Sequence, residues 1–303
     1  MNRPVRILAS HSLLHSIDRD QQQLPSLKQQ VTDLSGGYIR RVDRFIELCL
    51  LGALNCVGRR QLPATTATYL ASRCGAVQTP SQAMASIFVD HQLPKPLHFV
   101  NTLGNTAGFY LTRGLGISGQ TLVLSKESLS FEAALFQAVL DLQTGVVETA
   151  LVGGVDEVTL PVSAQARRLD APGAQRLLEG SHWLLLTADE ETAAAGNPGI
   201  GLPEYLSGLD QLSAWLAKQS VSDLQLCFSA SEAEQRVLAQ SRQRIVDASA
   251  GERHHGALEH GVYSGAALVE LLQSCQRTDF GDSRVGIHLE RSGNCYCAVS
   301  IHR

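Results

Sequence analysis

The chain has 303 residues, of which 44% are hydrophobic and 18% charged, and its formal net charge is −4 at neutral pH. This composition suits a globular protein of one large or two small domains with a substantial core. The negative charge argues against a general nucleic-acid surface, which needs excess Lys and Arg to displace counterions from phosphates. Arg59-Arg60 and Arg167-Arg168 are the best candidates for a local basic patch. Exposed pairs of arginines such as these are more often ordinary solvent-exposed surface than a binding site.

The N-terminal sequence and the cysteines both favour the cytoplasm. The first apolar stretch is broken by Ser and His and is followed at once by acidic residues, unlike a signal peptide. The longest apolar segment, 45–57, contains Glu47 and Asn55 and is shorter than the ~20 residues of a membrane span. The seven cysteines are odd in number and several have apolar neighbours, which is typical of reduced, buried thiols. Cys295 and Cys297 would share one face of a strand, where core packing is favoured over a metal pair.

Strand and helix patterns alternate along residues 1–162, which we expect to form one half of the protein. Pro94 and Pro96 predict an extended connection, and Gly145 predicts a helix end. The segment 146–152 is uniformly apolar, which predicts a strand buried on both faces. We expect strands at 5–9, 67–70, 121–125 and 146–152, and helices at 40–54, 81–90, 104–113 and about 128–144.

A polar link at 163–178 is expected to separate this half from a second half at 179–303, the two together forming one structural unit. The segments 122–135 and 224–238 both run from an apolar strand through a Ser-rich elbow into a helix, which favours a pseudo-duplicated α/β architecture. In the second half we expect strands near 179–187, 224–228, 285–290 and 295–301, and helices after 188, at 231–244 and near 264.

Two patterns suggest cofactors, and neither is in the right context. Gly114, Gly116 and Gly119 match a dinucleotide pattern, but they follow a helix and lead into a strand, the reverse of what pyrophosphate binding needs. His254, His255 and His260 do not have the spacing of a common zinc site, so a surface loop is favoured. We therefore expect no cofactor and no metal.

The elbow 125-SKES-128 has two interpretations. A helix N-terminus stabilises an anionic nucleophile, but a serine hydroxyl needs an adjacent base, and no His lies nearby in sequence. The alternative is that Ser128 caps the helix, as serine often does. The cap is favoured, with Ser128 as an acyl-accepting nucleophile kept as the second hypothesis.

The chain resembles the β-ketoacyl synthases of the thiolase superfamily. The matching stretches occur in the family's order: 40-RRVDRF-45, 98-HFVNTLGNTAGFYLT-112, the elbow through Gly153-Gly154, 179-EGSHWLLLTADEETAAAGNPG-199 and 291-RSGNCYCAVSI-301. The resemblance implies a five-layered αβαβα fold of two similar halves, in a chain shorter than a full synthase. It also marks Lys126, Glu127, Gly293 and Asn294 as elbow and loop positions.

The family's catalytic groups are not matched. Its nucleophilic Cys falls on Ser128, and its first His falls near Ser229. The second His has a neighbour in His260, which is slightly out of register and is only a weak candidate. Because such groups act as a unit, losing them should remove condensing activity.

The resemblance therefore implies a catalytically silent subunit of the chain-length-factor type, as in type II polyketide and aryl-polyene systems. Its partners would be a full-length ketosynthase, in a heterodimer, and an acyl carrier protein. The strand ending at Gly153, or a close neighbour, would pair across the dimer. Four side chains are candidates for the acyl tunnel or the interface, with ordinary core as the alternative: Phe109, Tyr110, Leu111 and Phe131.

Overall fold

The structure is a computed structural model. It describes residues 3–36, 42–94, 96–169, 172–189, 191–192, 196–219, 223–228, 230–241, 244–246, 265, 268–273 and 285–302. The strands of this part of the chain are β1 Arg6–Asp18, β2 Ala67–Ala71, β3 Thr121–Leu124, β4 Thr149–Asp156, β5 Arg176–Thr187, β6 Gly199–Ile200, β7 Glu204–Ser207, β8 Asp223–Leu226, β9 Arg244–Val246, β10 Val285–Ser292 and β11 Cys295–His302. The helices are α1 Lys28–Ser35, α2 Arg44–Val57, α3 Gln78–Phe88, α4 Pro96–Asn101, α5 Thr106–Leu115, α6 Ser130–Thr144, α7 Val162–Arg168, α8 Gly208–Leu216 and α9 Glu232–Gln240, and residues 268–273 are also helical.

The strand order shows an internal repeat. One part of the sheet runs β3-β2-β4-β5-β1, with three parallel strands followed by β5 and β1, each antiparallel to its neighbour. The other part runs β9-β8-β10-β11-β7 and has the same directions. The short β6 joins the two by pairing with β1 and β11. The predicted pseudo-duplication is therefore present in the topology.

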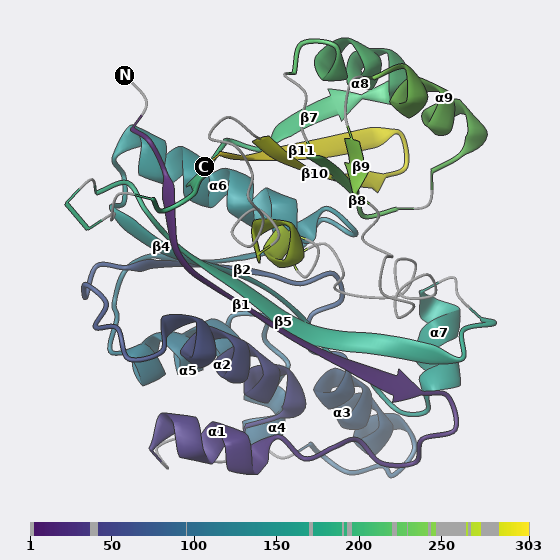
Figure 1. Cartoon of the computed structure of the whole chain (residues 1–303). Helices are drawn as coiled ribbons and strands as arrows, with labels where there is room; N and C mark the ends of the chain where they lie inside the picture. The colour runs from purple at the N-terminus through teal and green to yellow at the C-terminus, as the bar shows by residue number, and fades with distance from the viewer. Residues whose placement is uncertain are drawn as a thin grey trace.

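The layers follow from which faces are apolar. Helices α2 and α5 pack on the outer face of β2, β4 and β5, and α8 and α9 pack on the outer face of β10 and β11. Between the two parts of the sheet, α6 and residues 268–272 share one core with strands from both. Figure 1 shows this central helix layer between β4 and β11. The five-layered αβαβα arrangement expected from the resemblance is confirmed.

Several elements form as the sequence indicated. All eight residues of β4 are buried, and Gly145 ends α6 in the left-handed region at φ 77°. Asp43 caps α2 by accepting a hydrogen bond from the Ile46 amide, 3.2 Å. The turn between β10 and β11 places Gly293 at φ 57°, a conformation that favours glycine.

Other expectations were wrong. Pro96 opens the short helix α4 in place of an extended connection, because proline is tolerated at a first helical position. The segment 163–178 holds most of α7 and the start of β5, and 188–198 shows no helix among its described residues. β1 continues to Asp18 because its polar residues lie on a half-exposed strand. Since β5 pairs with β4 and β1, we propose that the repeat boundary follows Thr187.

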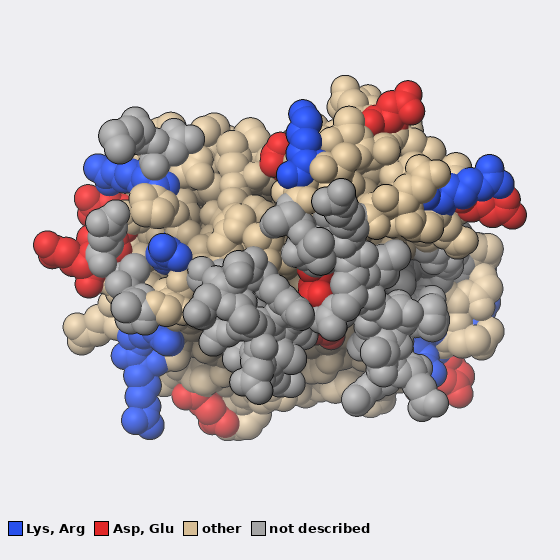
Figure 2. Space-filling view, turned by 45° about the horizontal axis from the view of Figure 1, so that its top comes forward, with Lys and Arg blue, Asp and Glu red and all other residues tan. Residues whose placement is uncertain are grey.

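The surface shows the mixed charge expected from the slightly negative net charge of the chain. On the face seen in Figure 2, Lys and Arg side chains are scattered and interleaved with Asp and Glu. No helix in the described part of the chain is both long enough and apolar enough to cross a membrane.

Candidate functional site

The elbow between β3 and α6 is built as a sharp, solvent-facing turn. Ser125, Lys126 and Glu127 are exposed, and Ser128 is half-buried. Glu127 has φ 50°, in the left-handed region that a side chain with a Cβ rarely adopts. The residue held in the strained conformation at the tip is therefore Glu127, one position before the predicted Ser128.

Ser128 is not the cap of α6. The helix begins at Ser130, its N-cap is Leu129, and no side chain caps it. Instead the Ser128 Oγ donates to the backbone carbonyl of Arg291, 2.9 Å away on β10. Ser130 closes the elbow, since its Oγ accepts from the Lys126 amide at 2.8 Å and donates to the Glu127 carbonyl at 2.7 Å. Ser128 thus connects the elbow to the second repeat.

Lys126 and Glu127 also face the second repeat and do not bond to each other. The Lys126 ammonium lies 4.0 Å from the centre of the Tyr205 ring, a cation–π contact with β7. One carboxylate oxygen of Glu127 accepts from the Ser292 hydroxyl at 3.1 Å. Three consecutive elbow residues therefore contact the second repeat.

In the first turn of α6, Glu132 forms a buried set of polar groups with His288 of β10 and with Cys227, which directly follows β8. Glu132 Oε1 lies 2.9 Å from His288 Nε2, and His288 Nδ1 lies 3.3 Å from Cys227 Sγ. Glu132 and His288 are fully buried and Cys227 is 2% exposed. Burial, and then the neighbouring Glu132, raise the pKa of Glu290 well above its usual range. The sequence carried one signal for this set, because the alternation of β10 puts His288 and Glu290 on one face.

The double glycine of β4 makes room for two aromatic rings. A Cβ on Gly153 would lie 2.2 Å from Trp183 Cδ2, and a Cβ on Gly154 would lie 3.0 Å from Phe131 Cδ2. Both positions therefore need glycine for close packing against β5 and α6.

The four tunnel or interface candidates separate by exposure. Leu111 and Phe131 are buried in two different core clusters, and Tyr110 packs against one of them. Phe109 is 55% exposed and its ring meets Tyr110 edge-on at 5.5 Å. Of these four side chains only Phe109 is exposed, so it is the one that a partner could contact directly.

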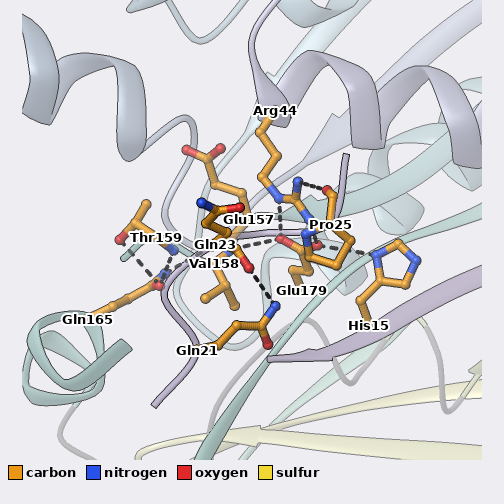
Figure 3. Close-up of polar contacts among 10 residues, drawn as sticks. All are labelled: His15, Gln21, Gln23, Pro25, Arg44, Glu157, Val158, Thr159, Gln165 and Glu179. Carbon is orange, nitrogen blue, oxygen red and sulfur yellow. Dashed lines mark hydrogen bonds and ion pairs between the residues drawn. The ribbon is translucent and has the colours of Figure 1, made fainter. Parts of the chain in front are cut away.

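A second polar cluster lies on the outer side of the first repeat, drawn in Figure 3. Arg44 donates from Nε to Glu179 Oε2 at 2.8 Å, from Nη2 to Glu179 Oε1, and from Nη1 to the Pro25 carbonyl at 2.7 Å. His15 and the Val158 amide complete the shell of Glu179. Burial alone would raise the pKa of Glu179, but the bonds from His15 and Arg44 outweigh it and lower that pKa. Two motifs of the resemblance, Arg44 and Glu179, thus form one structural ion pair.

A pocket of about 1270 Å³ opens beside this cluster, between α2, α3 and α7. Its lining includes Arg44, Thr79, Asn101 and Gln165, and none of the elbow residues. The buried Oδ1 of Asn101 has no hydrogen-bond partner in the described part of the chain. The pocket is therefore separate from the elbow, on the outer side of the first repeat.

The histidines of the second half that are candidate catalytic residues lie outside the residues that the structure describes. His254, His255, His260 and Ser229 all lie among residues that the structure does not describe. Within the described ranges, no group of three His, Cys, Asp or Glu side chains could hold a metal ion. Asn294 accepts a 2.8 Å bond from the Gly208 amide at its carbonyl, so the Gly293–Asn294 loop positions the start of α8.

No protein-family model and no curated protein matches the sequence. Solved structures do match in shape. A chain of a type II polyketide synthase complex, in which an acyl carrier protein is bound to its ketosynthase, aligns with TM-score 0.72 and 13% identity over 100% of this chain and 99% of that one. A chain of the ishigamide ketosynthase/chain length factor aligns with TM-score 0.70 and 14% identity over 98% of both chains.

A β-ketoacyl synthase from Burkholderia phymatum STM815 aligns with TM-score 0.67 and 13% identity over 100% of both chains. The chain has the ketosynthase fold. Like the ketosynthase/chain-length-factor structures, it presents a thiolase-like scaffold, and identity of this size establishes the fold alone.

Proposed function

We propose that this chain is a chain-length-factor-type subunit that pairs with an active ketosynthase during chain elongation on an acyl carrier protein. The observation that carries the proposal is the Ser128 hydroxyl, which stands where the resemblance places the catalytic thiol and donates to the Arg291 carbonyl. A hydroxyl held this way has no base to activate it among the described residues. The subunit would contribute shape to a heterodimer and leave condensation to its partner.

An exposed strand edge gives the proposed heterodimer its contact surface. β4, the strand that contains Gly153, lies between β2 and β5 and cannot pair with another chain, which leaves the second part of the expectation, a close neighbour of that strand. β3, which pairs with β2 on the far side from β4, is the edge strand, and Leu122 and Val123 on it are 38% and 40% exposed. Exposed edges pair readily with strands of other chains.

Apolar side chains extend from this edge over α3, α4 and α5. We call this set the apolar face: Met84, Ile87, Phe88, Phe99, Val100, Leu103, Phe109, Leu122 and Val123, each between 38% and 70% exposed. Large apolar patches on a protein surface mark interaction sites. A ketosynthase-like partner with an equivalent edge strand and apolar helices would bury the face by continuing the sheet across the dimer axis.

The proposal also covers the cellular location of the subunit and the pathway in which it takes part. The N-terminal sequence and the cysteines favour a cytoplasmic protein. By the resemblance it would belong to a polyketide-type pathway, of which aryl-polyene synthesis is the example closest to a compact subunit. A homodimer that holds acyl chains without chemistry would use the same apolar face and is distinguished by its stoichiometry.

The second candidate is an enzyme with Ser128 as acyl acceptor. Its only support is the position of Ser128 at the elbow, and the bond to Arg291 counts against it. Incubation with acyl carrier protein or an acyl thioester, followed by mass spectrometry, tests it directly. An adduct that disappears in Ser128→Ala would establish this candidate in place of the first.

The test of the main proposal is co-expression with candidate ketosynthases, followed by size-exclusion chromatography. We expect a 1:1 complex, and self-association of the chain alone. The double substitution Leu122→Lys/Val123→Lys should abolish the complex, because it places two charges in the pairing edge. Val146→Lys is the matched control, since Val146 is 65% exposed and lies outside the apolar face. A stable monomer that binds no ketosynthase would overturn the proposal.

A further inference from the structure

We propose that the pocket beside the Arg44–Glu179 pair binds a short stretch of extended peptide through the main-chain groups of that peptide. The pocket lies between α2, α3, α4 and α7 and has a volume of about 1270 Å³. Its described lining residues include none from the elbow and none from the apolar face. The inference therefore goes beyond the proposed function and does not rest on it.

Most of the buried polar groups in the pocket wall are already bonded within the protein. Arg44 is paired with Glu179, as Figure 3 shows. Thr79 Oγ1 donates to Asp43 Oδ2 at 2.7 Å, and the Gln165 carboxamide bonds to backbone groups through both its oxygen and its nitrogen. Each of these lining side chains is more than nine-tenths buried: Arg44, Thr79 and Gln165. Their bonds fix the shape of the wall before any ligand binds.

Asn101, the last residue of α4, is the exception in this wall. It is 5% exposed, and its Oδ1 is buried without a hydrogen-bond partner in the described part of the chain. A buried polar atom without a partner costs free energy, which a ligand that supplies the missing bond would recover. The last torsion of an asparagine side chain is broad, so Asn101 can turn its oxygen or its nitrogen toward a ligand. The unpaired carboxamide marks a place for a hydrogen-bonding ligand.

The polar groups of the lining match an extended peptide. Carboxamides are the commonest polar side chains in it: Gln23, Gln78, Gln82, Asn101 and Gln165. A carboxamide carries a donor and an acceptor side by side. In an extended chain the N–H and C=O of one residue point to the same side, as they do in a hydrogen-bonded pair of an antiparallel sheet. One carboxamide can therefore bond to both main-chain groups of one peptide residue.

The other lining residues argue against a charged or flat ligand. The guanidinium of Arg44 is paired with Glu179, and the two carboxylate oxygens of Asp43 accept from the Ile46 amide and from Thr79. The rest of the described wall includes aliphatic side chains and no aromatic ring. A nucleobase thus has no aromatic surface on which to stack. Three of the aliphatic residues could accommodate small peptide side chains: Leu24, Leu160 and Ala164.

Helix α3 separates this pocket from the proposed dimer surface. Four of its residues line the pocket at the spacing i, i+3, i+4 and i+7, which places them on one side of the helix: Gln78, Ser81, Gln82 and Ala85. Met84 and Ile87 of the apolar face fall outside that side. A peptide in the pocket and a subunit on the apolar face can therefore be bound at the same time.

The experiment is saturation-transfer NMR on the full chain with acetyl-trialanine amide. The side chains of this probe are methyl groups, so its binding reports recognition of the main chain. Maltotriose is the comparison, because it is uncharged and rich in hydroxyl groups but has no peptide group. We expect saturation transfer to the peptide and none to maltotriose. No transfer to the peptide from folded wild-type protein, or transfer to maltotriose alone, would overturn the proposal.

Asn101→Leu tests the residue that carries the proposal. It should weaken peptide binding about tenfold. It should also leave the free chain at least as stable in urea, because it replaces an unpaired buried polar group with an apolar group of similar size. Asn105→Leu is the matched control, since Asn105 is exposed and is not among the lining residues. Unchanged binding by Asn101→Leu, or a less stable Asn101→Leu chain, would show that Asn101 serves the fold and not a ligand. Complex formation by Asn101→Leu with a ketosynthase should be unchanged and tests the proposed function separately.

Discussion

The hydroxyl of Ser128 donates a 2.9 Å hydrogen bond to the backbone carbonyl of Arg291, a residue 163 positions later in the chain. In this way the elbow of the first repeat is joined to the end of β10 in the second. Lys126 and Glu127 make further contacts to β7 and Ser292. The elbow therefore acts as a connection between repeats, which explains its shape without a nucleophile at its tip.

Replacing Ser128 with Ala should lower the free energy of unfolding by about 1 kcal/mol, the net value of a typical partly buried hydrogen bond. Urea denaturation followed by circular dichroism measures the change. Ser125→Ala is the control, because Ser125 is exposed and its 3.3 Å bond to the Arg73 carbonyl is long. Equal effects of the two substitutions would show that the link to Arg291 contributes nothing special.

Local sequence patterns correctly predicted those features whose cause lies within a short segment of the chain, such as the burial of a strand or a turn at a glycine. The apolar run of β4, the Gly145 end of α6 and the Gly293 turn follow from burial and from backbone conformations that glycine adopts. The pairing of β5 with β4 and β1 could not be predicted, because an apolar strand carries no information about its neighbours. The same applies to the identity of β3 as the edge strand.

The sequence predicted where in the chain the candidate site lies, but it did not predict which residues form the site. The sequence located the elbow, but it placed the tip at Ser128 and offered a cap, whereas φ 50° marks Glu127 as the strained residue. Cys227 and His288, which are in contact, lie 61 residues apart in the chain, and His288 and Glu132 lie 156 residues apart. No spacing rule on a single segment could have identified that set.

The strain at Glu127 gives a second prediction. Glycine normally costs about 0.5–1 kcal/mol relative to alanine, but at a positive φ it avoids the Cβ clash. Glu127→Gly should therefore be more stable than Glu127→Ala by about 1 kcal/mol, measured by urea denaturation. Both variants lose the bond to Ser292, so it cancels in the comparison. A more stable alanine variant would show that the elbow relaxes out of the left-handed region.

The Arg44–Glu179 pair should behave as a buried ion pair. Arg44→Met leaves an uncompensated carboxylate and should cost about 3–5 kcal/mol of unfolding free energy. The double substitution Arg44→Met/Glu179→Leu should recover a large part of that loss, because no buried charge is left alone. Chemical denaturation of both single variants and the double variant measures the coupling. Additive losses would mean that the two side chains do not stabilise each other.

Glu157 should make the protein less stable as pH rises through neutrality. Burial raises its pKa from 4.5 to about 7, against the opposing effect of the Gln78 and Val77 amides, which donate to Oε1. Its Oε2 has no hydrogen-bond partner among the described residues. Because the folded state holds the proton more tightly, the stabilisation from this group is complete below pH 4.5 and is lost as pH rises to about 7. This rise in the pKa of Glu157 corresponds to about 3 kcal/mol of unfolding free energy between the two ends of that pH range.

Glu157→Gln isolates this effect, because the amide keeps an acceptor for both backbone donors and cannot ionise. Urea denaturation at pH 5 and pH 8 should show a smaller difference in unfolding free energy for the variant than for the wild type, and a more stable variant at pH 8. Exposed Glu148→Gln is the control and should leave the difference unchanged. Glu179 acts in the opposite sense: its lowered pKa gives stability above pH 4.5 that is lost in acid. The two carboxyls together place the expected stability maximum in the mildly acidic range, and a maximum above pH 8 would contradict the raised pKa of Glu157.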